Sequence, residues 1–518
     1  MPLHSCFQCA IIRQIDCLSE SVVRMKKGFD NALYVKLQSE KILERIRKFD
    51  NKLYLEFGGK LFDDMHAFRV LPGFESDAKC KILLQLKDQS EIIFVISAAD
   101  LERNKIRADF GIPYGTDVLR QIDKLRGLGL NMNSVVVTQY EGQSAADKFI
   151  AKLKGHGLKT YIHRKTKGYP TEVDIIVSDE GYGANPYIET VKPLVVVTAP
   201  GPGSGKLATC LSQLYHEYKR GVRAGYAKFE TFPIWNLPLR HPVNVAYEAA
   251  TADLGDVNMI DPYHLETYGI TTVNYNRDIE CFPIVKSILS KITGDENIYN
   301  SPTDMGVNMA GYGIVDDEVC REAARQEIIR RYYKIACDYK TGNVAADAFE
   351  RIRLLMNENK ISIDERACVK PALEKAESSG SSAVAIGLEG GEFVTGKSNK
   401  LMTACASAVL NAVKTLSRIA DDMLLLSPIV LAPIIQLKKE VLREDRIKLS
   451  LGDVLTALSI CAATNPIAEK AMNMLIRLRG CDAHSSCILP ESDQGMMRKL
   501  GINMTCEPEF GTKDLYGF

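Results

Sequence analysis

The sequence predicts an α/β fold: a mostly parallel sheet with helices on both faces, Rossmann-like or P-loop-like, followed by a smaller C-terminal α+β domain. Two observations lead to this prediction. Short runs rich in Val and Ile alternate with amphipathic stretches over the first 225 residues, which is the pattern of β-α-β units. The last of these runs is followed directly by a glycine-rich loop, Gly201–Lys206, and then by a helical stretch.

The expected elements follow one another from Asn31. Residues Asn31–Lys48 have the apolar spacing of an amphipathic helix, as do Thr116–Leu128 and Ser144–Lys154. The expected strands are Lys52–Phe57, Glu91–Ser97, Ser134–Thr138, Lys159–His163, Val173–Ser178 and Leu194–Thr198. Ligands bind beyond the carboxyl ends of parallel strands. We therefore expect one rim to carry the segments after four of these strands, namely Ser97–Asp100, Thr138–Tyr140, Ser178–Gly181 and Gly201–Lys206.

A chain of 518 residues is expected to form two to four domains. We divide it into a leader (1–24), an α/β domain with the glycine-rich loop (25–225), a polar segment with little periodicity that forms a cleft (226–317), a helical connector (318–377) and the C-terminal domain (378–518). In the last of these, a hairpin is expected around Gly390-Gly391.

The composition argues against two classes of function. Lys and Arg together number 65, as do Asp and Glu, so no basic excess points to nucleic acid or a membrane surface. The longest apolar run, Met423–Ile435, is too short to span a bilayer and contains two prolines. The 14 scattered cysteines are typical of reduced thiols, so we expect a cytoplasmic protein. Self-association into a homo-oligomer is left open.

The glycine-rich loop is the most direct indication of a ligand. Gly201, Gly203, Ser204, Gly205 and Lys206 form a cradle whose backbone N–H groups, helix start and ammonium suit a phosphate. The loop departs from the P-loop pattern at Pro200, where a glycine is expected, and at Leu207, where a Mg²⁺-binding hydroxyl is expected. Ser204 or Thr209 would have to supply that hydroxyl. The alternative is a tight turn that binds nothing.

Lys228 and Glu230 lie two residues apart, so in a strand they share one face. Such a pair would clamp an anion and hold Mg²⁺ or act as a base. The alternative is a solvated surface ion pair.

An acidic group formed by Asp253, Asp256 and Asp261, with His264 and Glu266 nearby, is a candidate Mg²⁺ site, because carboxylates are the ligands that Mg²⁺ prefers. Aspartates in such a loop are also common as turn residues and helix caps.

Further polar residues complete the candidate site. Arg277 would offset negative charge, and Asp304 would act as a base or metal ligand, unless both segments merely pack one domain onto another. Lys397 and Ser398 form a second cradle-like string before a helix, where Ser398 or Asn399 as an ordinary N-cap is the alternative. His484, between two cysteines, is expected to be a hydrogen-bonded structural residue rather than a zinc ligand.

Several long polar strings resemble one family of uncharacterised, mainly bacterial proteins, the domain of unknown function 1846. The strings lie at 60–64, 69–74, 177–183, 199–206, 229–239, 274–278, 301–308 and 480–484. The resemblance runs from about Lys27 to Pro508. It implies an N-terminal α/β portion and a smaller C-terminal α+β portion, and it carries over no catalytic residue.

Together these patterns favour an enzyme that acts on a small phosphorylated molecule or a nucleotide, by Mg²⁺-dependent phosphoryl or nucleotidyl transfer. In this interpretation Lys206 and the loop hold phosphate, and Asp304, Glu230 or the Asp253–Asp261 group supplies a metal ligand or a base. Two alternatives remain open: a non-catalytic sensor of a nucleotide or phosphometabolite, and a hydrolase of a non-nucleotide anionic substrate.

Overall fold

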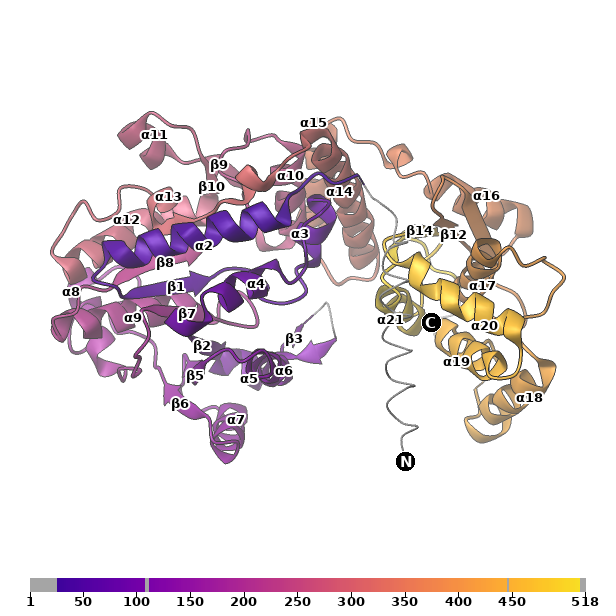
Figure 1. Ribbon diagram of the computed structural model, residues 1–518, viewed down its shortest axis with the longest axis horizontal. Coiled ribbons are helices and arrows are strands. Elements are labelled where there is room, and N and C mark those ends of the chain that lie inside the picture. The colour runs from indigo at the N-terminus through magenta and orange to yellow at the C-terminus, as the bar shows by residue number, and fades with distance from the viewer. Residues whose placement is uncertain (1–25, 108–110, 445–446, 513–518) are drawn as a thin grey trace, which may run out of the picture. The chain divides into compact units, whose positions relative to one another are not determined.

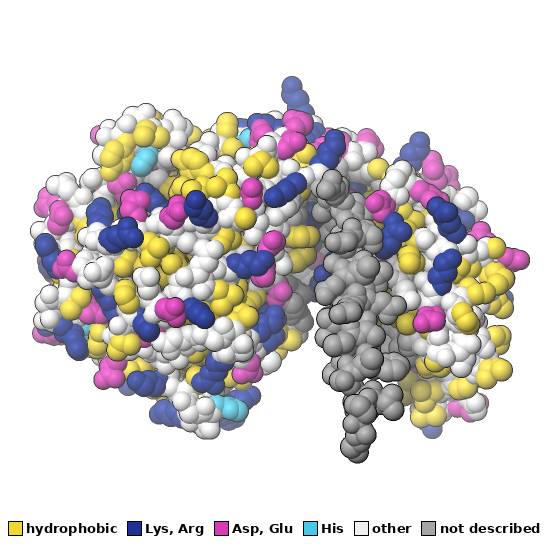
Figure 2. Space-filling model, in the orientation of Figure 1, with side chains coloured by type: hydrophobic (Ala, Val, Ile, Leu, Met, Phe, Trp, Pro, Cys, Tyr) yellow, Lys and Arg dark blue, Asp and Glu magenta, His cyan; other side chains and the backbone are white. Residues whose placement is uncertain are grey.

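The computed structural model describes residues 26–107, 111–444 and 447–512 (Figure 1). The predicted leader, residues 1–24, lies outside the described residues. The described chain divides into two compact units, one ending at Arg325 and the other beginning at Gln326, within helix α14 (Asp317–Lys340). On the face seen in Figure 2, Lys/Arg and Asp/Glu side chains are intermixed, as the equal numbers of the two signs suggest.

The first unit is built on a seven-stranded, all-parallel sheet in the order β11-β8-β1-β7-β2-β5-β6. The strands are β1 (Leu53–Phe57), β2 (Ser90–Ser97), β5 (Met132–Thr138), β6 (Lys159–Ile162), β7 (Leu194–Thr198), β8 (Gly225–Phe229) and β11 (Gly306–Val307). All residues of β1, β2 and β7 are buried, so these strands form the centre of the core. The predicted α/β class is confirmed.

Strands β1 and β7 are neighbours, yet the chain leaves them in opposite directions. From β1 it crosses to β2 on one side, and from β7 it crosses to β8 on the other. Right-handed crossovers therefore place α4 (Ala78–Gln85) and α9 (Lys206–Lys219) on opposite faces of the sheet. Accordingly α2 (Asn31–Lys48) packs against α4, whereas α9 packs against α12 (Asn276–Thr293). In open α/β sheets the ligand-binding crevice lies at such a divergence, beyond the carboxyl ends of the two strands.

The remaining helices of the α/β portion are short or pack against strands β2, β5 and β6. They are α3 (Met65–Val70), α5 (Ala98–Glu102), α6 (Tyr114–Gly127) and α7 (Ser144–Gly155), with a small ribbon of β3 (Ile106–Arg107) and β4 (Ile112–Pro113) between α5 and α6. The predicted helices and five of the six predicted strands are confirmed to within two residues at each end.

The strand predicted at Val173–Ser178 is wrong: Val173–Ile176 forms a helical turn, α8. A short apolar run fits either structure, and here only Ile176 is fully buried, on a turn that packs against α12. Ser178–Gly181 therefore follows a helical turn instead of a strand of the sheet. The Ser178 hydroxyl there accepts the N–H groups of Glu180 and Gly181, which closes a local turn.

The segment 226–317 is more regular than its sequence suggests. It contains α10 (Pro242–Ala250), β9 (Asn258–Ile260), α11 (Pro262–Tyr268), β10 (Val273–Tyr275), α12 and α13 (Pro302–Met305), and β9 pairs with β10 antiparallel. Three of its prolines occupy the first turn of a helix, where the missing N–H costs nothing. Residues that looked like loop formers are therefore helix starts.

The second unit holds a four-stranded mixed sheet in the order β13-β12-β14-β15. Its strands are β12 (Ala383–Gly387), β13 (Phe393–Lys397), β14 (Asp482–Ser485) and β15 (Asn503–Cys506). Its helices are α15 (Ala346–Glu358), α16 (Val369–Ser379), α17 (Ala404–Ser417), α18 (Pro428–Gln436), α19 (Leu451–Ala462), α20 (Pro466–Asn473) and α21 (Glu491–Lys499). The hairpin around Gly390-Gly391 is confirmed. Among the described residues, no helix has both the length and the apolar character needed to cross a membrane.

Candidate functional site

The loop from β7 to α9 lies at the crevice between β1 and β7. Gly203 and Gly205 adopt φ of 75° and 89°, a region that favours glycine. Gly205 is the N-cap of α9, and it has no side chain to accept a hydrogen bond from the first turn. Gly201 meets Tyr114 so closely that a Cβ at this position would lie 2.2 Å from the Tyr114 Oη. The first turn of α9 thus begins without the side-chain cap that a Ser, Thr, Asp or Asn would supply.

Side chains from within and beside the loop hold it in place. The Ser204 hydroxyl donates to the Gly201 carbonyl (2.9 Å), and the Thr209 hydroxyl donates to the Gly205 carbonyl (2.9 Å). From the end of β5, the Thr138 hydroxyl donates to the Ser204 carbonyl (2.7 Å). Both hydroxyls that were expected to replace the missing Mg²⁺ ligand are therefore engaged with the backbone.

Lys206, the first residue of α9, extends toward the neighbouring strand β1. Its ammonium lies 3.8 Å from Glu56 Oε1, and both side chains are about one-eighth exposed, at 13% and 12%. The second oxygen of Glu56 accepts a hydrogen bond of 2.8 Å from the Tyr226 hydroxyl on β8. Glu56 therefore connects the loop to the next strand of the sheet.

Lys228 is the centre of the charged group on β8. It lies opposite Glu56 in the strand register, and its ammonium contacts Glu230 Oε1 (2.7 Å) and Asp278 Oδ2 (2.5 Å). The shared face of Lys228 and Glu230 is as predicted, but the pair is largely buried, with side chains 25% and 6% exposed. The solvated surface pair is therefore excluded.

Burial and neighbouring charge shift the protonation of this group. Burial opposes the charged form of Lys228, but the carboxylates of Asp278, Glu230 and Glu56 more than offset it and raise its pKa well above the usual value. Burial raises the pKa of Glu230 to about 7, with Asp278 and Glu56 adding to the rise and Lys228 opposing it. A carboxyl that titrates near neutral pH beside a ligand crevice is a candidate acid–base group.

A second buried ion pair lies beyond the end of β1. The Lys79 ammonium is 3.0 Å from Asp64 and donates to the Gly58 carbonyl at 3.2 Å. Burial would raise the pKa of Asp64, but Lys79 outweighs it, so that the pKa lies below its usual value. This pair fixes the backbone where the chain leaves β1.

The candidate metal ligands are held by protein contacts. Asp256 is paired with Arg277 at 2.6 Å, and Asp261 caps α11 while accepting the Thr303 hydroxyl at 2.7 Å. The side chain of Asp253 lies outside the described part of the structure. Within the described residues, no three His, Cys, Asp or Glu side chains gather as a metal site requires. Asp256 and Asp261 therefore already have protein partners, and the described residues do not gather them into a Mg²⁺ site.

The two remaining catalytic candidates have structural partners. Arg277 is half exposed and bound to Asp256, whereas its neighbour Asp278 reaches Lys228. Asp304 accepts hydrogen bonds of 2.9 Å from the Tyr268 hydroxyl and from the Asn300 N–H. Of the acid–base candidates, only Glu230 thus has a described contact to the charged group at the crevice.

Lys397 and Ser398 belong to the second unit. Lys397 is an exposed residue at the end of β13, and Ser398 accepts a hydrogen bond from Lys448 (2.9 Å). The alternative role of Ser398 or Asn399 as a helix N-cap is wrong, because α17 begins at Ala404 and its N-cap is Thr403. The adjacent glycine, Gly396, serves packing: a Cβ there would lie 2.1 Å from the Ala408 nitrogen.

His484 uses both ring nitrogens in protein contacts. Nδ1 lies 2.8 Å from the Thr505 hydroxyl, and Nε2 lies 3.1 Å from Glu507. Burial lowers its pKa. The hydrogen bonding predicted for this histidine is confirmed.

Glu56 and Asp278 were not selected as candidates from the sequence. Glu56 is the one charged residue in the otherwise uncharged strand Leu53–Phe57, and a charge in a buried strand is itself a signal. Asp278 lies in the first turn of a helix that the sequence pattern did not reveal.

The fold and the site define a doubly wound α/β protein with a glycine-rich, charge-paired crevice at its switch point. The chain belongs to the DUF1846 family: "Domain of unknown function DUF1846, N-terminal" matches residues 27–360, and the corresponding C-terminal domain matches residues 364–516. It is 58% identical over 500 residues to a UPF0371 protein of Clostridium botulinum strain Langeland, covering 95% of this chain and 99% of that one. A UPF0371 protein of Clostridioides difficile strain 630 is 57% identical, covering 95% and 100%.

Proposed function

We propose that this protein binds a phosphorylated small molecule or nucleotide in the crevice between β1 and β7 and is an enzyme that acts on it. The supporting observation is that the switch point, the uncapped start of α9 and Lys206 coincide. The N–H groups of Gly203–Lys206 and the Lys206 ammonium bind the phosphate. Lys228 and Glu230 lie at the end of β8, which is separated from β7 by strand β1 with Glu56.

Glu230 is the group we propose for proton transfer. Its pKa of about 7 lets it give or take a proton at neutral pH, and Lys228 holds its carboxyl at 2.7 Å. Phosphoryl or nucleotidyl transfer is the reaction class proposed for this arrangement. In this proposal Mg²⁺ would be held mainly by the phosphates of the ligand, because Asp256 and Asp261 are engaged with protein partners.

A non-catalytic sensor of the same ligands is the second candidate. It is favoured by Leu207 in place of the usual hydroxyl and by the backbone contacts of Ser204 and Thr209. The two candidates differ in turnover: the enzyme releases product with time, and the sensor does not.

The test is calorimetric titration with pyrophosphate and with ADP, each with and without Mg²⁺. We expect Lys206→Met to weaken binding by about tenfold or more, a loss of about 1.4 kcal/mol. Lys219→Met is the matched control, because it removes a lysine from the last turn of the same helix. Lys397→Met, in the other unit, should leave the affinity unchanged. Failure of the parent protein to bind any phosphate compound would contradict the proposal.

A further inference from the structure

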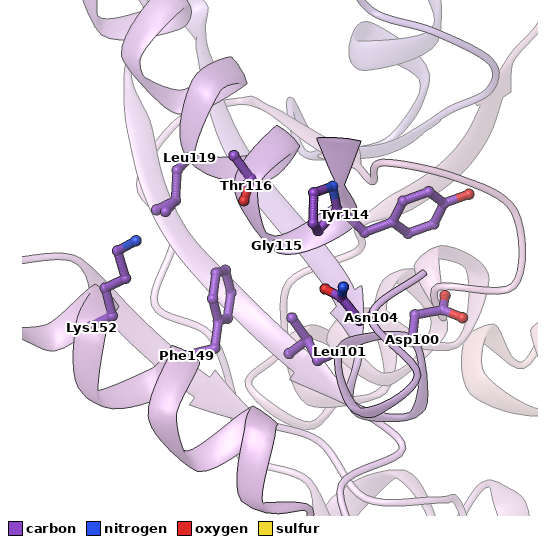
Figure 3. A pocket seen from close by; sticks show the side chains of 10 residues that line it. Asp100, Leu101, Asn104, Tyr114, Gly115, Thr116, Leu119, Phe149 and Lys152 are labelled. Atoms are coloured by element: carbon purple, nitrogen blue, oxygen red, sulfur yellow. The ribbon is translucent and has the colours of Figure 1, made fainter. Parts of the chain in front are cut away.

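A second hollow lies near the phosphate loop, between α5, α6 and α7 (Figure 3). Its volume is about 160 Å³. The apolar side chains of Leu101, Leu119 and Phe149 line it together with Pro113, and in Figure 3 the first three surround the space next to the first turn of α6. The exposed polar side chains of Asn104, Thr116 and Lys152 also line it. Polar and apolar groups share the lining of this open hollow in similar measure, which suits a ring that carries heteroatoms.

Tyr114 connects this hollow to the loop. It is the first residue of α6 and lines the hollow, while its hydroxyl lies against Gly201. The Lys105 ammonium lies 5.1 Å from the centre of the Tyr114 ring, and Lys105 in turn pairs with Asp100 at 3.6 Å. A single tyrosine side chain therefore spans the distance between the hollow and the phosphate loop.

We propose that this hollow holds the organic ring of the phosphorylated ligand, a single six-membered heterocycle of the pyrimidine class. The proposal rests on the proposed function, since the phosphate at Gly201–Lys206 is what places the ligand. The size supports a single ring, because a cavity of about 150 Å³ accommodates benzene. The buried ring of Phe149 forms part of the wall and offers an aromatic contact, and Asn104, Thr116 and Lys152 provide hydrogen-bonding groups for ring heteroatoms.

The probes are UDP, ADP and inorganic pyrophosphate, each titrated calorimetrically into the full chain. We expect UDP to bind about tenfold or more tightly than pyrophosphate, since the aromatic contact and the hydrogen bonds of a seated ring together are worth at least that factor. Thr116→Trp places a large ring at the opening and should reduce UDP affinity to the level of pyrophosphate without changing pyrophosphate binding. The matched control is Asp123→Trp, which adds the same ring at an exposed position two turns further along α6.

Phe149→Leu is a second variant that keeps an apolar side chain and removes the stacking surface; it too should weaken UDP alone. Equal affinities of UDP and pyrophosphate in the parent, or an equal effect of both tryptophan variants on UDP, would overturn the ring site while leaving the proposed function intact. Tighter binding of ADP than of UDP would overturn the single-ring assignment. Absence of all binding would contradict the proposed function itself.

Discussion

Glu230 provides the sharpest test of the charged group. Its pKa rises from 4.5 to about 7 on folding, because burial and the nearby carboxylates of Asp278 and Glu56 outweigh Lys228. Between these two pH values the folded protein keeps a proton that the unfolded chain has lost, so stability falls as the pH rises through this window. At about 1.4 kcal/mol per pKa unit, the whole shift corresponds to about 3 kcal/mol, most of it between pH 5 and pH 8.

Glu230→Gln keeps the shape of the side chain and removes its titration. We therefore expect the free energy of unfolding of the variant, relative to that of the parent, to rise by about 2 kcal/mol between pH 5 and pH 8. Urea unfolding followed by tryptophan fluorescence measures this, because Trp235 is the only tryptophan in the chain. It belongs to the first unit and packs against Gly306, beside Glu230 Oε2.

The control is Glu266→Gln, which neutralises an exposed glutamate of the same unit. The difference in unfolding free energy between Glu266→Gln and the parent should stay the same from pH 5 to pH 8, whereas the difference for Glu230→Gln should grow. A difference for Glu230→Gln that is independent of pH, or that grows toward pH 5, would refute the reasoning about burial and charge.

Two further predictions concern other parts of the first unit. Gly205→Ala should destabilise the protein by about 1–3 kcal/mol and weaken pyrophosphate binding, because φ is 89° and the new Cβ would lie 3.0 Å from Thr138. Gly221→Ala, with φ of 80° and open space around it, should cost stability in thermal unfolding but leave binding unchanged. Burial lowers the pKa of His163 to about 4. The neutral histidine should therefore contribute about 3 kcal/mol to the free energy of unfolding above pH 6.5, and this contribution should be lost as the pH falls to 4. His163→Gln, which can still donate to the Pro186 carbonyl, should flatten that pH dependence in urea unfolding; an unchanged slope would contradict it.

The sequence predicted those parts of the molecule that local patterns determine. Val/Ile-rich runs identified most strands, and two-residue spacing placed Lys228 and Glu230 on one face. The run at Val173–Ser178 failed because apolar character alone does not distinguish a strand from a helical turn. The sequence did not predict which residues far apart in the chain meet. Glu56 meets Lys206 only because β1 and β7 are neighbours in space.

Arg277 and Asp278 show why the candidate site was only partly predictable. Consecutive residues of a helix point about 100° apart, so only one of the two can face β8. Without the helix α12 and its orientation, the sequence offered no means of choosing, and the arginine was chosen on chemical grounds. In the structure Arg277 turns to Asp256, and Asp278 turns to Lys228.

The pairing of charges sets limits on any ligand of the crevice. Lys206 lies near Glu56, Lys228 contacts Glu230 and Asp278, and so the lysines that would attract a phosphate already have carboxylate neighbours. An added dianion competes with those carboxylates, and the competition is weakest when one of them is neutral. Glu230 is the carboxylate that can become neutral near pH 7. If a phosphate binds there as proposed, its binding and the protonation of Glu230 favour each other by linkage. The residue proposed for proton transfer would then also be the one whose neutral form accommodates the added negative charge.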